Sequence, residues 1–204
     1  MNPKPAVDPA NREVNPTAAP DTEAAPAANL FAARDVEEVL RQRGWLDADA
    51  TAKLSEKENA AISEWLERAA ALLGPRAADR EELEALLSLI FSYDARTILE
   101  ASEAQAVIAR MGAREVIREL ARRVLGGPAI DSDGFKALIE GLKSATRYRS
   151  RELFHPIRMA LAGRPGEGEL DRVILLLDSA AELPFAIPVK GTRARMLEFC
   201  AALD

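Results

Sequence analysis

The residues best suited to chemistry lie between Arg147 and Leu170, in the run R-Y-R-S-R-E-L-F-H-P-I-R-M-A-L-A-G-R-P-G-E-G-E-L. This run is basic, although the whole chain has a formal net charge of −6. The planar guanidinium group of arginine offers five donors that match phosphate and carboxylate oxygens. The sequence therefore indicates an anion-binding surface, with a solvated charged loop as the plain alternative. The basic residues just before and within this run are Lys143, Arg147, Arg149, Arg151, Arg158 and Arg164, opposed only by Glu152 until Glu167.

Pro156 suits the first position of a helix, because it lacks a backbone N–H and its φ is fixed near the helical value. We expect a short helix over residues 157–161, ended by Gly163 in a left-handed conformation. Arg158 would then lie in the first turn, beside backbone amides that have no partner within the helix. This arrangement predicts an outward guanidinium at a phosphate site.

The segment L-F-H-P-I-R-M-A-L-A-G, followed by a glycine-rich turn and E-L-D-R-V-I-L-L-L, resembles the C-terminal part of bacterial-type glutamyl-tRNA synthetases, which are class I enzymes. In that family, a Leu-Phe-x-Pro-hydrophobic-Arg-hydrophobic-Ala-Leu-Thr-Gly block precedes a short loop and a leucine-rich helix. The resemblance is strongest over residues 135–177 and extends more thinly back to about Ile62. It implies a multi-helix anticodon-binding domain, a helical cage, without the catalytic domain.

The resemblance also implies site residues. In the family, the arginine after the proline and the loop after the block approach the anticodon. The residues that we predict to contact RNA are Arg147, Tyr148, Arg149, Arg151, His155, Arg158, Arg164, Glu167 and Leu170. Tyr148 would stack on a base and the neighbouring arginines would hold the backbone, whereas His155 would pack, cap the helix or contact RNA.

Two departures weaken base reading by this site. Ala162 stands where the family has threonine, and Glu167 and Glu169 place carboxylates near an RNA backbone, which they repel. Carboxylates that tied up Arg158 internally would contradict this account of RNA contact.

The chain offers little for catalysis. Its single histidine, His155, precedes a proline and has no clustered partner for a catalytic triad or a metal site. The run K-L-S-E-K at residues 53–57 resembles the lysine loop by which class I synthetases hold ATP, but Glu56 reverses a charge, and Ser55 with Glu58 reads as a capping box. A single cysteine excludes an internal disulfide and a multi-cysteine zinc site. We therefore expect no enzymatic activity, no cofactor and no metal.

The composition favours helices. Apolar residues make up 48% of the chain and aromatic residues only 5%, so strand-forming side chains are scarce. We predict an all-α fold with a disordered Pro/Ala-rich tail or linker over residues 1–29, an N-terminal helical subdomain over 30–127 and a C-terminal one over 128–204. Predicted helix starts are Ser55 with Glu58, Asp79 with Glu82, Ser102 with Gln105, Asp131 and Thr192.

Two functions remain open at this point. The first is a non-catalytic, cytoplasmic tRNA-binding module that holds the anticodon stem-loop, without membrane contact, and works beside a separate synthetase catalytic subunit. The second is a helical protein–protein adaptor that kept the fold and lost RNA binding, a possibility that the acidic net charge favours. A fragment of a longer synthetase is a third interpretation of the linker-like N-terminus.

Overall fold

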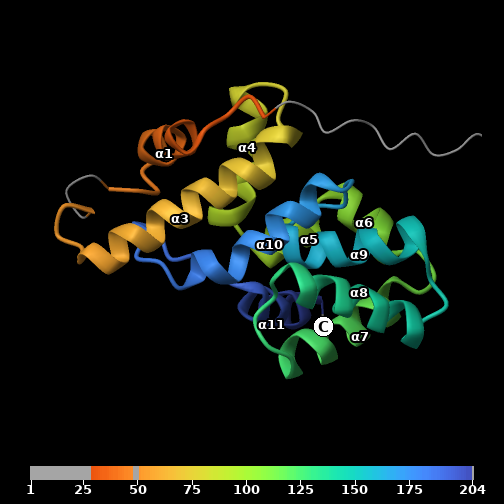
Figure 1. Cartoon of the computed structure of the whole chain (residues 1–204). Helices are drawn as coiled ribbons and strands as arrows, with labels where there is room; N and C mark the ends of the chain where they lie inside the picture. Colours follow the sequence, from red (N-terminus) through yellow and green to blue (C-terminus); the bar gives the residue numbers. More distant parts are fainter. Residues whose placement is uncertain (1–28, 48–50, 204) are drawn as a thin grey trace, which may run out of the picture.

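The computed structural model describes residues 29–47 and 51–203, and every regular element among them is helical (Figure 1). This confirms the all-α prediction. The elements are α1 (Ala33–Gln42), α3 (Glu56–Leu73), the short 3-10 helix η1 (Gly74–Arg76), α4 (Arg80–Phe91), α5 (Ala95–Glu100), α6 (Ser102–Ile108), α7 (Ala113–Gly126), α8 (Ser132–Ala145), α9 (Ser150–Ala162), α10 (Glu169–Ala181) and α11 (Thr192–Leu203).

The helices α1, α3 and α4 form one end of the molecule, and α6, α7, α8, α9 and α11 form the other (Figure 1). Helix α10 joins the two ends, because it packs against α3, α4 and α9. Its middle is accordingly apolar on nearly all sides, and residues 173–177 are all buried.

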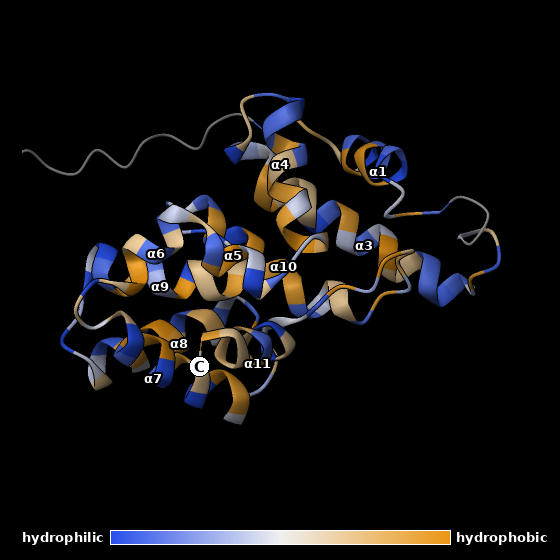
Figure 2. Ribbon diagram, turned by 180° about the vertical axis from the view of Figure 1, so that it is seen from behind, coloured by the Kyte–Doolittle hydropathy of each residue, from blue (hydrophilic) through white to orange (hydrophobic). Residues whose placement is uncertain are grey.

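The apolar faces of the helices point toward one another, as the colouring in Figure 2 shows. Buried residues on both sides of the predicted boundary at 127–128 belong to one hydrophobic cluster. Within it, Trp45, Trp65, Phe91 and Phe185 join the end of α1, α3, α4 and the loop after α10 through stacked and edge-to-face contacts, with ring centroids 4.7–6.3 Å apart. The division into two subdomains stays a prediction.

Several predicted helix boundaries are confirmed. The Oγ of Ser55 accepts from the Glu58 amide at 3.3 Å, and the Glu58 carboxylate accepts from the Ser55 amide at 2.8 Å. The Ser55 hydroxyl also donates to the Glu58 carboxylate at 2.6 Å, and this bond, together with the one from the Ser55 amide, lowers the pKa of Glu58. Asp79 and Asp131 likewise cap α4 and α8, accepting from backbone amides at 2.9 and 2.7 Å.

At Ser102 and Thr192 the helices begin at the predicted residues, but the predicted side-chain caps are wrong. The N-cap of α6 is Ala101, which makes no side-chain bond. The side-chain amide of Gln105 donates to the Leu99 carbonyl instead of to the predicted capping box. Thr192 is the first residue of α11, and its amide and hydroxyl donate to the Asp178 carboxylate at 2.6–2.9 Å. Partners this distant in sequence leave no local signal.

The predicted tail lies almost wholly outside the described residues, which begin at Asn29. Asn29 itself belongs to the folded part, because its side-chain amide donates to the Ala70 carbonyl at 3.2 Å and its oxygen accepts from the Phe31 amide at 3.0 Å. Within the described residues, no helix has both the length and the apolar character needed to cross a membrane.

Candidate nucleic-acid interface

Helix α9 begins at Ser150, six residues before the predicted start. Pro156 is therefore an interior residue of this helix, and it is buried. The apolar positions Leu153, Ile157 and Leu161 recur at helical spacing across the whole segment, and packing of this continuous face outweighs the missing amide of the proline. The prediction that a short helix starts at Pro156 is wrong. Its end is confirmed, since Gly163 has a φ of 93°.

Arg158 points inward, and only 7% of it is exposed. Its Nε and Nη2 donate to the two carboxylate oxygens of Asp171 at 2.7 and 2.9 Å, and its Nη1 donates to the Gly166 carbonyl at 2.6 Å. Its guanidinium also lies over the Phe154 ring, 4.9 Å from the centroid. The predicted outward guanidinium is wrong, because Arg158 instead ties the loop between α9 and α10 to the first turn of α10. The internal carboxylate that was expected to count against RNA contact by Arg158 is therefore present, and it is Asp171.

Tyr148 and Leu170 are also buried, with exposed fractions of 6% and 0%. The Tyr148 ring lies so close to Gly112 that a Cβ there would fall 2.0 Å from its Cζ. Its hydroxyl donates to Glu115 at 3.1 Å. The ring therefore anchors the α8–α9 loop to the start of α7 and is closed to stacking on a base.

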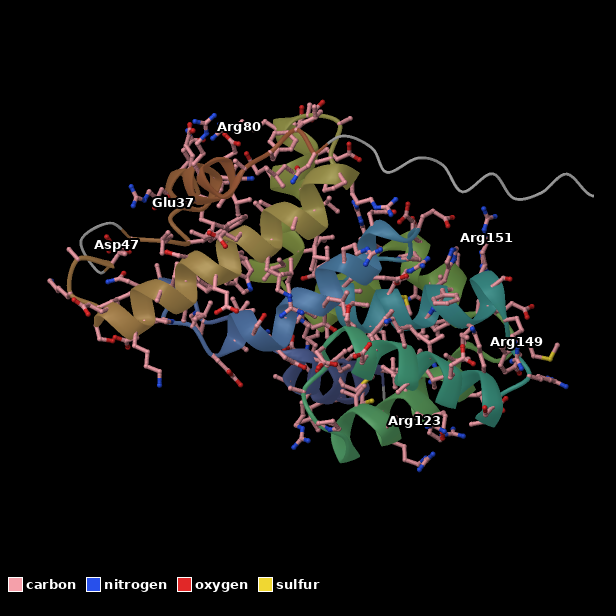
Figure 3. The ribbon with its side chains drawn as sticks, viewed as in Figure 1. Glu37, Asp47, Arg80, Arg123, Arg149 and Arg151 are labelled. Carbon is pink, nitrogen blue, oxygen red and sulfur yellow. The ribbon has the colours of Figure 1, made fainter. Side chains whose placement is uncertain are left out.

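The other predicted arginines lie on the surface. Arg147 is exposed, with its guanidinium over the Tyr148 ring at 5.5 Å. Arg149 donates to the carbonyls of Thr146 and Tyr148 at 2.9 and 2.7 Å. Figure 3 shows Arg149 and Arg151 projecting from the side of the molecule opposite to Glu37 and Arg80. These three arginines are brought together around the start of α9.

The predicted acidic loop lies next to this group. Glu167 is exposed and reaches Arg151 at 3.6 Å, with 69% and 75% of the two side chains open to solvent. A pair this exposed contributes little and leaves the arginine available. Arg164 is also exposed and forms no ion pair with any described residue.

His155 and Arg110 complete the group. Both line a small cavity with Met111, Arg151 and Glu152. The Nε2 of His155 is buried and has no hydrogen-bond partner among the described residues. Burial lowers the pKa of His155 most, and the positive charge of Arg110 lowers it further. Arg110 is not among the residues predicted to contact RNA, because it lies far outside the basic run in the sequence.

We call Arg110, Arg147, Arg149, Arg151 and His155 the basic surface. Within the described part of the chain, its first three arginines form no ion pair. Three arginines at the other end of the molecule differ, because each of them contacts a glutamate. These pairs are Arg41 with Glu37 at 2.6 Å, Arg43 with Glu84 at 2.5 Å and Arg80 with Glu38 at 3.1 Å. Beside α7 and α9, by contrast, several exposed arginines without an ion pair lie close together.

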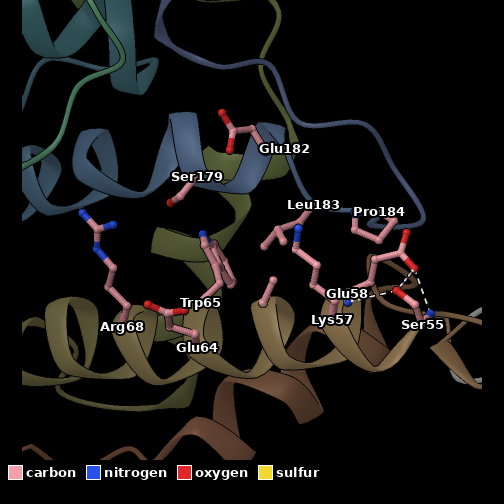
Figure 4. Close-up of a pocket in the computed structure, with 11 residues that line it drawn as sticks. Ser55, Lys57, Glu58, Glu64, Trp65, Arg68, Ser179, Glu182, Leu183 and Pro184 are labelled. Atoms are coloured by element: carbon pink, nitrogen blue, oxygen red, sulfur yellow. Dashed lines mark hydrogen bonds between the residues drawn. The ribbon is translucent and has the colours of Figure 1, made fainter.

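A second hollow of about 820 Å³ lies between α3 and the end of α10 (Figure 4). Two of the residues that line it, Trp65 and Arg68, join α3 to α10 by donating to the carbonyls of Leu176 and Leu175 at 3.3 and 3.1 Å. Ser55 and Glu58, from the predicted capping box, sit at one end and bond each other. The described residues contain no cluster of three potential metal ligands here or elsewhere. The capping interpretation of K-L-S-E-K is confirmed.

Fold and surface together define an all-helical domain with an accessible arginine group at one end. Residues 33–180 match the family described as "Anticodon binding domain", and the chain belongs to this family. The resemblance seen in the sequence is thereby confirmed.

The curated relatives include glutamate–tRNA ligases. The chain is 29% identical to that of Bacillus licheniformis over 125 residues, which is 61% of this chain and 25% of the relative. It is 31% identical to that of Heliobacterium modesticaldum over 88 residues, or 43% and 18%. It is 26% identical to glutamate–tRNA ligase 2 of Syntrophus aciditrophicus over 113 residues, or 55% and 23%. The match thus spans a quarter or less of each relative. No solved structure matches the chain significantly.

Proposed function

We propose that the chain is a non-catalytic tRNA-binding module whose basic surface holds the anticodon stem-loop. The observation that carries this proposal is the group of arginines without ion pairs beside α7 and α9, in a chain that is acidic overall and belongs to the anticodon-binding family. Phosphate contacts dominate the affinity of nucleic-acid complexes, and exposed arginines supply them.

The roles differ from those expected at the sequence level. Arg147, Arg149 and Arg151 would contact phosphates, and Arg164 would contribute from the neighbouring loop. Arg158 and Tyr148 would act by fixing the loops that carry these side chains. The exposed pair with Glu167 at 3.6 Å would leave Arg151 available for such a contact.

We further propose that the module assists aminoacylation carried out by a separate catalytic subunit. The matched relatives are named as ligases, and the similarity covers only 18–25% of their length. A module of this kind would raise the local concentration of tRNA beside its partner.

Binding of a synthetic glutamate-tRNA anticodon stem-loop tests the primary proposal. The triple variant Arg147→Ala/Arg149→Ala/Arg151→Ala is compared with Arg34→Ala/Lys57→Ala/Arg76→Ala, which removes the same charge from exposed positions elsewhere. We expect the first variant to bind at least about tenfold more weakly than wild type at low salt and the second to lose far less. Equal affinity of the two variants, or no binding by wild type, would contradict the proposal.

A protein–protein adaptor is the second candidate, and two observations favour it. Asp171 holds Arg158 inside the fold, and the hollow between α3 and α10 offers a mixed polar and apolar surface. An adaptor would bind no stem-loop at low salt while keeping its full helical content.

A further inference from the structure

We infer that Arg110, Arg114 and Arg118 form a row that binds phosphates, and that RNA held there and on the basic surface is bound with little regard to base sequence. This inference rests on the proposed function and adds a binding element and a substrate class to it: RNA stem-loops recognised through their sugar–phosphate backbone.

The row follows from spacing along α7. Arg114, Arg118 and Arg122 recur at every fourth position of α7, so that they fall on one side of the helix about 6 Å apart along its axis, and Arg110 lies in the turn just before the helix. The buried side of α7 consists of Val116, Ile117 and Leu120 with their neighbours, and the arginines of the row are all exposed.

The charges of the row are available. Arg110, Arg114 and Arg118 form no ion pair with any residue in the described ranges. Further along the same helix the situation changes, because Glu119 accepts from Arg122 at 2.6 and 2.9 Å and from Arg123 at 2.7 Å. These arginines lower the pKa of Glu119 to about 2. The available part of the row is therefore its first three members.

The row begins where the basic surface lies. Arg110 lines the same small cavity as Arg151 and His155. The start of α7 is held against the α8–α9 loop by the contact between Gly112 and Tyr148 and by the bond from Tyr148 to Glu115. A nucleic-acid strand that contacts the basic surface thus meets Arg110 first, with Arg114 and Arg118 next along the helix.

No tryptophan, tyrosine or phenylalanine among the described residues is fully exposed for stacking on bases. Sequence-specific RNA recognition relies on aromatic or guanidinium planes for stacking and on donors aimed at base edges. Both tryptophans, both tyrosines and all six phenylalanines of the chain lie in the described ranges, and each of them is buried or half-buried. Arg158 has committed three nitrogen donors to Asp171 and Gly166.

Flexible exposed arginines therefore remain as the principal contacts. Contacts to phosphates fix position but carry no sequence information. Base changes in the loop should consequently alter affinity only slightly, whereas loss of α7 arginines should weaken binding to every loop alike.

The experiment uses the full chain and four synthetic stem-loops with one stem: the glutamate anticodon, two other anticodons and a scrambled loop. Wild type is compared with Arg114→Ala/Arg118→Ala, and with Arg34→Ala/Arg76→Ala as a charge-matched control. We expect wild-type Kd values for the four loops to agree within about threefold. The α7 double variant should bind all of them on the order of tenfold more weakly, with a salt slope reduced by about two.

Discrimination above tenfold among the loops, or equal behaviour of the α7 and control variants, would overturn the inference while leaving stem-loop binding intact. Failure of wild type to bind any loop would overturn the proposed function together with this inference. Circular dichroism and thermal unfolding of each variant show that a loss of affinity is not a loss of fold.

Discussion

At the scale of single residues, Arg158 shows that the partner of a side chain can differ from what the neighbouring sequence predicts. The sequence pattern places an arginine two residues after a proline, but its partner Asp171 lies 13 residues later, beyond a turn. Local reasoning about helix starts carries no information on such a partner. The signal that could have located Arg110 was present, since arginines recur at every fourth residue from 110 to 122.

We predict that Asp171→Ala destabilises the protein by about 2–3 kcal/mol, because it leaves a nearly buried guanidinium without its carboxylate. The expected loss is below the ~3–5 kcal/mol of a fully buried pair, since 22% of the Asp171 side chain is exposed. Urea unfolding measures the change. The control Asp133→Ala breaks an ion pair whose side chains are 75% and 91% exposed, and should cost about 0–1 kcal/mol. Equal losses would show that Arg158 is not held by Asp171.

His155 gives a prediction for pH. Its pKa lies below the usual 6.5, first because the imidazole is buried and then because Arg110, Arg151 and Arg158 are positively charged. The negative charge of Glu167 acts in the other direction and raises the pKa. Glu152 lines the same cavity as His155. Well above pH 6.5 the imidazole is neutral in the folded and unfolded chains. As the pH falls below 6.5 the unfolded chain binds the proton first, so the free energy of unfolding decreases.

Because His155 is the single histidine of the chain, replacing it removes the whole contribution of histidine protonation to the pH dependence of stability. We expect the Tm of wild type to fall more between pH 7.5 and 5.5 than that of His155→Asn. Any packing lost in the variant adds an offset that does not depend on pH. Parallel Tm curves for the two proteins would contradict the lowered pKa.

At the scale of elements, the sequence predicts what depends on near neighbours. The helical class, the caps at Ser55, Asp79 and Asp131, and the stop at Gly163 all follow from side chains within a few residues. The start of α9 could not be found in this way. The rule for proline at a first helical position competed with the apolar spacing of Leu153 and Ile157, and tertiary packing decided between them.

We predict that Gly112→Ala destabilises the protein by about 2 kcal/mol or more. Gly112 has a φ of 91°, which alone costs other residues about 1–2 kcal/mol, and its new Cβ would strike the Tyr148 ring. The matched change Gly126→Ala, at the end of the same helix and in open space, should be neutral or stabilising by up to about 1 kcal/mol. Thermal and urea unfolding give both values. A neutral Gly112→Ala would show that Tyr148 does not rest on α7.

At the scale of the whole molecule, charge is distributed unevenly. Three arginines on or just after α1 and α4 (Arg41, Arg43 and Arg80) are paired with glutamates. Those on the first half of α7 and around the start of α9 form no ion pair with described residues, apart from the exposed contact of Arg151. An acidic chain with such a patch would bind RNA in one orientation, and its affinity would fall steeply with salt.

The most direct test maps where RNA binds. Backbone amide NMR shifts of the full chain are recorded at low salt during titration with an anticodon stem-loop. The account predicts that the largest changes fall in residues 110–118 and 146–155, with few in α1 and α4. Changes concentrated along the hollow between α3 and α10, or no saturable change, would contradict it.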